Sequence, residues 1–204
     1  MKHVVVLACA ALLIGCSSAP PRPTGFLGDS SQLAPVPGEP DRLYWESPGV
    51  AWGSYTKVML EPVTLCLSQE ARGRELRPED TSRMKDYFRA KAVEAIQSGY
   101  PVVDAPGPGV LRIRAAITDL VPTNVAQNLL TTAALGLAVD MGGASMEAEF
   151  LDGTTGERLA AVIDRKTGSP LALVENFTTW DHAKAAFDEW AQELRQALDE
   201  VHPR

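Results

Sequence analysis

The stretch Ala144–Arg165, which reads ASMEAEFLDGTTGERLAAVIDR, decides the fold of this chain. Two apolar-rich runs flank the sequence DGTTG, and the first run alternates Met, Ala and Phe with two glutamates. Alternation with a period of two is typical of a strand with one buried face, and Asp-Gly sequences favour tight turns. The stretch therefore predicts a β-hairpin of strands 144–151 and 158–165 with a polar outer face.

A third strand is predicted over Val110–Leu120, because Leu, Ile and Ala alternate there with two arginines, Arg112 and Arg114. These arginines fall on one face of their strand, as Glu147 and Glu149 do in the hairpin. If the two strands are neighbours, we expect cross-strand ion pairs that contribute about 0.2 to 1 kcal/mol each. The alternative is a charged patch that binds a ligand or a protein partner.

Other strands are expected nearer the N-terminus, at Leu43–Trp45, at Tyr55–Leu67 and at 101–104. The nearly continuous apolar character of Tyr55–Leu67 indicates a strand that is covered on both faces or lies near the sheet centre. Pro62 instead favours a bulge or the sheet edge, because proline cannot donate to a strand ladder. The sequence leaves both positions open.

Two long helices complete the pattern. The first spans Pro78–Gln97, with proline and acidic residues in its first turn and Gly99 just past its end. The second begins near Thr178 or Thr179 and continues to about Val201 with an apolar stripe at helical spacing. The order of elements predicts an α+β fold, in which a mixed, mostly antiparallel sheet carries both long helices on one face.

The Ala/Leu-rich segment Asn124–Met141 contains the uncharged run TTAALGLAV at Thr131–Val139. A run without charge is typical of a core helix under the sheet. The same lack of a polar face would also suit a surface for self-association or one that lies near a membrane. We keep both interpretations.

The N-terminus has the order of a secretory signal peptide: a lysine, an apolar run and small residues. The sequence LIGC, which ends at Cys16, resembles the bacterial lipobox. That resemblance implies cleavage between Gly15 and Cys16, removal of residues 1–15, and a diacylglycerol and acyl chains on Cys16. The apolar run is shorter than the roughly 20 residues that span a bilayer. The alternative is an ordinary secreted protein cleaved near Ala19.

Ser17 follows the predicted lipidation site, and by resemblance to the sorting rules of diderm bacteria it favours the outer membrane, with the protein facing the periplasm. Residues 16–40 are rich in Pro, Ser and Gly and are expected to form a tether, followed by a single α+β domain at 41–204. Phe26 and Leu27 are too apolar for a simple spacer. We therefore expect part of the tether to dock against the domain.

The chain is acidic, with 19 basic and 26 acidic residues and a net charge of −7. Removal of residues 1–15 takes away one lysine, so the mature balance is 18 − 26 = −8. This charge argues against nucleic acid as a partner. After cleavage and lipidation Cys66 would be the one free thiol, and its apolar neighbours predict a buried strand cysteine rather than a reactive one.

No metal or cofactor site is expected, since the mature chain offers only His182, His202 and Cys66 as soft ligands. His182 beside Asp181 could form a catalytic pair, but polar residues at a helix start explain the two more simply. Of the four tryptophans, Trp190 lies on the apolar stripe of the last helix and is expected in the core. The other three leave open a site where sugar or peptide rings stack.

Several segments together resemble a family of proteobacterial lipoproteins known as domain of unknown function 3313. The resemblance rests on the order of four segments, which are Gly25–Leu27 with Leu33, Tyr55–Val63, Val110–Leu120 and Glu147–Asp164. That family has no established activity. The resemblance therefore implies no catalytic or binding residue.

These observations predict an outer-membrane lipoprotein that is not an enzyme. Its expected partners are the membrane, through the lipid anchor, and another envelope protein or a second copy of itself. The alternative is a small envelope hydrolase or a ligand carrier whose site is built from carboxylates, with Asp119 and Asp140 as candidates. A deep apolar pocket with acidic groups would favour the alternative, and a flat surface would not.

Overall fold

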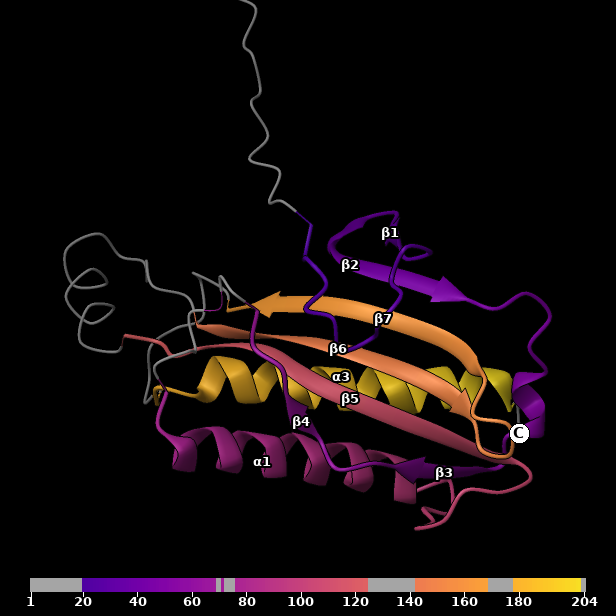
Figure 1. Ribbon diagram of the computed structural model, residues 1–204. Helices are drawn as coiled ribbons and strands as arrows, with labels where there is room; N and C mark the ends of the chain where they lie inside the picture. The colour runs from indigo at the N-terminus through magenta and orange to yellow at the C-terminus, as the bar shows by residue number, and fades with distance from the viewer. Residues whose placement is uncertain (1–19, 69–70, 72–75, 125–141, 169–177, 203–204) are drawn as a thin grey trace, which may run out of the picture.

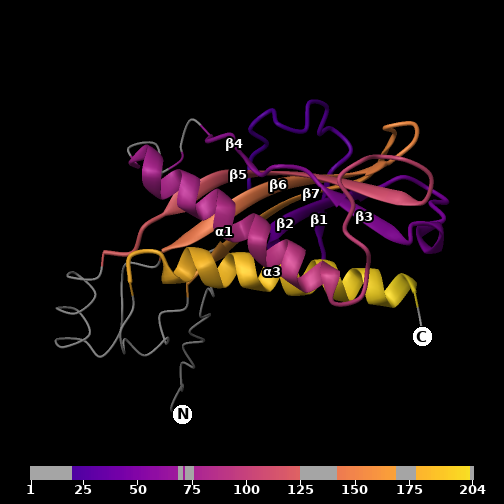
Figure 2. The same ribbon diagram turned by 90° about the horizontal axis from the view of Figure 1, so that it is seen from below.

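The protein folds as one sheet with both long helices on the same face. In the part of the chain that the computed structural model describes, seven strands form this sheet, and an N-terminal segment crosses its other face (Figure 1 and Figure 2). The predicted α+β fold, mixed and mostly antiparallel, is confirmed. The described residues are 20–68, 71, 76–124, 142–168 and 178–202.

The sheet has the order β1-β2-β7-β6-β5-β3, and β4 also pairs with β5. The strands β3 and β4 run parallel to β5, whereas the other neighbouring strands are antiparallel. The strand bounds are β1 Ala34–Val36, β2 Glu39–Glu46, β3 Lys57–Leu60, β4 Thr64–Leu65, β5 Val110–Val121, β6 Gly143–Asp152 and β7 Arg158–Thr167.

The predicted hairpin is formed by β6 and β7, and Asp152 fixes its turn. The Asp152 carboxylate accepts hydrogen bonds from the backbone N–H groups of Thr154 and Thr155 at 2.8 and 2.7 Å. Gly153 donates its N–H to the Val110 carbonyl at 2.9 Å, and a Cβ on Gly153 would lie only 2.5 Å from that oxygen. Glycine is therefore required where the turn approaches the start of β5.

The apolar stretch Tyr55–Leu67 forms two short strands, β3 and β4, at the sheet edge rather than one central strand. The break between them contains Pro62, so the edge position that this proline favoured is confirmed. The strand expected at 101–104 contributes a single bridge between Val58 and Val102.

The helix α1 spans Pro78–Gln97, as predicted, and α3 spans Asp181–Val201. The helix α3 begins at Asp181 because this carboxylate accepts bonds from the Thr178 N–H and hydroxyl, which holds the preceding turn outside the helix. The Phe88 and Phe187 rings stack between the helices with their centroids 4.8 Å apart. Among the described residues no helix is long and apolar enough to cross a membrane.

The N-terminal segment 20–33, which we call the strap, crosses the sheet face opposite the helices (Figure 2). Its backbone N–H groups at Thr24 and Leu27 donate to the two oxygens of Glu147 at 2.5 and 3.3 Å. The Leu27 side chain is buried against Ala161 and Ile163 of β7. The strap is thus held by both hydrogen bonds and apolar contact.

The strap covers the face of the hairpin that was expected to be polar and exposed, so this prediction is wrong. Glu147 is 0% exposed, and the buried Glu149 forms ion pairs with Arg114 and Arg158. The Phe26 ring covers Arg114, with the guanidinium carbon 5.2 Å from the ring centroid. The expected docking of Phe26 and Leu27 is observed, and it explains why glutamates on this face lie out of contact with water.

The sheet also takes in part of the expected tether 16–40. Strand β1 lies inside that range, and the boundary expected near Pro40 falls within β2. Pro21 is already buried. Proline is compatible with an edge strand, so a Pro-rich composition did not prevent pairing at the end of the sheet.

The Glu147 carboxylate should determine whether the strap stays docked. We expect Glu147→Ala to lower the free energy of unfolding by about 1 to 3 kcal/mol, because two N–H groups lose their acceptor. Hydrogen exchange at the Thr24 and Leu27 amides should speed up in the same variant. Urea unfolding and exchange measured by NMR would test this. Glu157→Ala, at an exposed position of the same hairpin, is the control.

Candidate functional site

A cavity of about 400 Å³ lies between the sheet and the C-terminal half of α3. Its apolar floor comes from three central strands and the helix. The residues of this floor are Leu111, Met146, Phe150, Val162, Trp190 and Leu194. A void of about 50 Å³ shares five of these side chains, so the apolar space continues into the core between the sheet and the helices.

Strand β2 supplies one wall of the cavity. Because side chains alternate along a strand, Arg42, Tyr44 and Glu46 all point toward the helices. Their cross-strand partners on β7 include Val162, which belongs to the cavity floor. Strand β2, next to the short edge strand β1, thus presents three polar side chains to an otherwise apolar space.

The mouth of the cavity is organised around the carboxylate of Glu46. It accepts hydrogen bonds from the Tyr44 hydroxyl and the Trp52 indole N–H, both at 2.8 Å. Burial, and then the bond to Glu46, raise the pKa of Tyr44 well above its usual value, so the phenol stays neutral. The Trp52 ring meets Phe150 edge-on with centroids 6.5 Å apart, which joins the mouth to the floor.

The back of the cavity is held by Asp164, which is 3% exposed. Its Oδ2 accepts bonds from the Arg42 guanidinium and the Trp190 indole N–H, both at 2.7 Å. Arg42 also pairs with Glu193 at 2.5 Å. Burial lowers the pKa of Arg42, but the bond to Asp164 and the nearby carboxylates outweigh it and raise the pKa. Burial also lowers the pKa of Lys166, but its bond to Glu193 and the nearby Asp164 outweigh burial and raise the pKa. Arg42 is therefore a structural cation.

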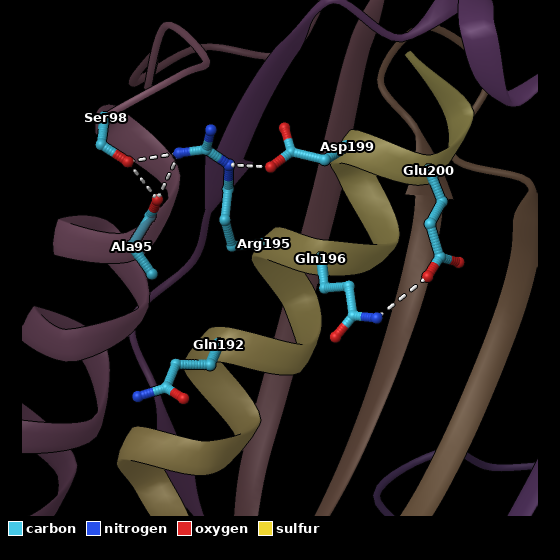
Figure 3. A pocket seen from close by; sticks show the side chains of 7 residues that line it. All are labelled: Ala95, Ser98, Gln192, Arg195, Gln196, Asp199 and Glu200. Carbon is cyan, nitrogen blue, oxygen red and sulfur yellow. Dashed lines mark hydrogen bonds and ion pairs between the residues drawn. The ribbon is translucent and has the colours of Figure 1, made fainter. Parts of the chain in front are cut away.

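A second hollow lies between α1 and α3, with a volume of about 630 Å³, and is widely open to solvent (Figure 3). Arg195 occupies its wall and donates to the Ala95 carbonyl at 3.1 Å and to Ser98, while it pairs with Asp199 at 2.9 Å. These contacts satisfy the carboxyl end of α1. Arg195 thus joins the two helices, and the hollow is a surface groove rather than an enclosed site.

The charged constellation predicted from the sequence is a structural network. Arg114 lies opposite Glu149 and pairs with it, as expected, whereas Arg112 pairs with Glu61. Glu147 serves the strap instead of an arginine. The alternative, a free charged patch on this face, is therefore wrong.

The other predicted residues do not meet in one site. Cys16, Gly15 and Asp140 lie outside the described residues, as does most of the Ala/Leu-rich segment. Asp119 lies at a bulge of β5, where its carboxylate accepts the Leu120 N–H at 2.8 Å, and it does not line the cavity. Cys66 is only half-buried, and its sulfur accepts a bond from the Thr24 hydroxyl at 3.4 Å.

Of the Asp181–His182 pair, Asp181 has the expected role at the start of α3. Burial raises the pKa of Asp181, but its bonds from Thr178 outweigh burial and hold the pKa below the usual value. In the described ranges no three His, Cys, Asp or Glu side chains gather to hold a metal ion.

The sequence identified the tryptophans but not the cavity. Trp190 is buried, as predicted, and Trp52 stands at the mouth. The polar residues Tyr44, Glu46 and Glu193 were missed. The one local signal was the spacing of Arg42, Tyr44 and Glu46, whose period of two places three polar groups on one face of a short strand.

Fold and cavity together define an α+β domain with a preformed cavity between sheet and helix. The family model described as "Protein of unknown function (DUF3313)" matches residues 22–194, so the chain belongs to that family. The resemblance found in the sequence is confirmed. No curated protein matches the chain.

Two solved structures match most of this chain at low identity. One is the PelC dodecamer from Paraburkholderia phytofirmans, at 13% identity and a TM-score of 0.41, covering 78% of this chain and 94% of that one. The other is protein XCC0632 from Xanthomonas campestris, of family DUF330, at 8% identity and a TM-score of 0.45, covering 77% and 91%. Both likenesses are too distant to carry a function over.

The Asp164 carboxylate should be the strongest polar contributor to the cavity wall. We expect Asp164→Asn to lower the free energy of unfolding by about 1.5 to 3 kcal/mol, the range for hydrogen bonds to a charged group. Glu39→Gln, at a carboxylate that is 49% exposed beside the same Arg42, should cost at most about 1 kcal/mol. Urea unfolding of both variants decides the matter, and equal losses would contradict this role of Asp164.

Proposed function

We propose that this protein is a non-catalytic envelope lipoprotein whose domain binds a small, largely apolar ligand in the cavity between the sheet and α3. The observation that carries the proposal is the cavity itself. Its volume of about 400 Å³ is within the roughly 300 to 1,000 Å³ of small-molecule sites, and most of its lining is apolar. Of the functions expected from the sequence, the cavity favours the ligand carrier over a module that only binds other proteins.

The lining supports binding rather than catalysis. Among the described residues the cavity wall contains no Ser, Thr or Cys as nucleophile and no His or Lys as general base, and of its three glutamates Glu193 is already paired with Arg42. Its buried charges are already paired, as Arg42 is with Asp164 and Glu193. Such a site can exclude water from an apolar ligand and hold it in one orientation.

The location that we propose is the periplasmic side of the outer membrane, with Cys16 as the lipid anchor. It is supported by the LIGC sequence and by Ser17. Several acyl chains would hold the protein on the bilayer, since each buried methylene contributes about 0.8 kcal/mol. Pro21 is buried and lies five positions after Cys16, so at most about 18 Å of extended chain would separate lipid and domain.

The cavity should take up a neutral apolar dye. We expect N-phenylnaphthylamine to gain fluorescence on saturable binding to the mature chain, because it leaves water for an apolar site. Ala197→Trp, at an exposed position on the cavity rim, should weaken binding about tenfold, which equals about 1.4 kcal/mol.

The matched control is Ala90→Trp, at an exposed position of α1 away from the cavity. It should bind the dye like the unmodified protein. Absence of saturable binding, or equal binding by both variants, would refute the proposed ligand site.

Lipidation is tested separately from the cavity. We expect Cys16→Ser to abolish incorporation of labelled palmitate in cells and to move the protein from the membrane fraction to the soluble fraction. The comparison variant is Cys66→Ser, which keeps the predicted lipidation site and should remain acylated. Unchanged labelling of Cys16→Ser would rule out the anchor.

A further inference from the structure

We propose that the ligand of this cavity is a small organic cation with an apolar body, which places its positive group at the mouth beside Glu46, in the negative field to which Glu200, shared with the hollow of Figure 3, also contributes. This inference rests on the proposed function and adds the chemical class of the ligand. Three observations carry it: the charges of the lining, the state of the carboxylates of Glu46 and Glu200, and the aromatic rings beside Glu46.

The lining carries an excess of negative charge. Its ionisable side chains are one arginine and three glutamates, apart from the neutral Tyr44. The arginine, Arg42, is committed to Asp164, Glu193 and Glu39 at 2.5 to 2.7 Å. Its charge is therefore balanced before any ligand enters, and the remaining field at the mouth is negative.

Glu46 and Glu200 are the carboxylates of the lining that have no ion-pair partner among the described residues. Glu46 accepts two neutral hydrogen bonds, from Tyr44 and Trp52, and Glu200 accepts one from Gln196 at 3.1 Å. Neutral donors orient a carboxylate but leave its charge uncompensated. Both side chains are exposed, so water solvates these charges until a ligand cation pairs with them.

Aromatic rings at the mouth favour the same class of ligand. Trp52 donates its indole N–H to Glu46, so this hydrogen bond does not use the face of the ring. Tyr44 bonds to the other oxygen of the same carboxylate and is 38% exposed. A cation within about 6 Å of an indole face gains about 0.5 to 2 kcal/mol. Carboxylate and ring together suit an ammonium group better than a hydroxyl or an acid.

The floor sets the size of the apolar part. At about 30 Å³ per atom, the share of a water molecule in the liquid, the cavity holds on the order of a dozen non-hydrogen atoms, and the larger N-phenylnaphthylamine would extend into its open mouth. Phe150, Trp190 and Leu194 line the space where that part would lie. An aryl-alkyl amine meets both requirements.

The test uses three probes of one shape: phenylbutylamine, phenylbutanol and phenylbutyrate. Each is titrated at pH 7 against the mature chain loaded with N-phenylnaphthylamine, and displacement of the dye gives its affinity. We expect the amine to bind at least about tenfold more tightly than the acid, with the alcohol between them. Added salt should narrow the difference, because exposed charges are screened.

The double variant Glu46→Gln/Glu200→Gln should remove the preference for the amine and leave the affinity of the alcohol unchanged. Glutamine can still accept the bonds from Trp52 and Tyr44, so the mouth keeps its shape. Glu157→Gln, an exposed substitution at the hairpin turn, is the matched control and should keep the preference.

The outcomes separate the two proposals. Equal binding of the three probes, tighter binding of the acid, or an amine preference that survives in the double variant would overturn the cationic ligand while the cavity remains a binding site. Failure of the dye itself to bind, or to respond to Ala197→Trp, would overturn the proposed function and this inference with it.

Discussion

The pairing of Asp164 with Arg42 and Trp190 is the contact on which the rest of the structure depends. A buried carboxylate is unfavourable without partners, and this one takes them from β2, the second strand of the sheet, and from the long C-terminal helix. It thereby joins β2, β7 and α3 at one point. The cavity lies beside this contact, since Arg42 and Trp190 are both part of its lining.

This arrangement explains why the cavity is polar at one end and apolar at the other. The strands β5 and β6 contribute interior positions, which are filled by side chains such as Leu111 and Phe150. Strand β2 lies near the sheet edge, where the alternate positions Tyr44 and Glu46 meet solvent. A ligand in the cavity would therefore be oriented by the sheet order itself, with its polar end toward β2.

Much of the fold could be predicted from local patterns. The hairpin, β5 and α1 follow from periodicity and turn residues that lie within each segment. Glu147 was misassigned because its environment depends on Thr24 and Leu27, more than a hundred positions away, and a period of two identifies a face without saying what covers it. The cavity was missed for the same reason, since Tyr44 and Glu193 become neighbours of one space only after β2 has paired with β7 beneath α3.

If Cys16 carries the lipid anchor that we propose, the position of the strap has a mechanical consequence. Tension along the chain from Cys16 would load the bonds of Thr24 and Leu27 to Glu147 before it reached β1, and Glu147 belongs to β6, which lies between β5 and β7. The force would enter the interior of the sheet before it could peel β1 from the edge. Movement of the membrane would then be transmitted to the domain as a whole, without distortion of β2, which borders the cavity.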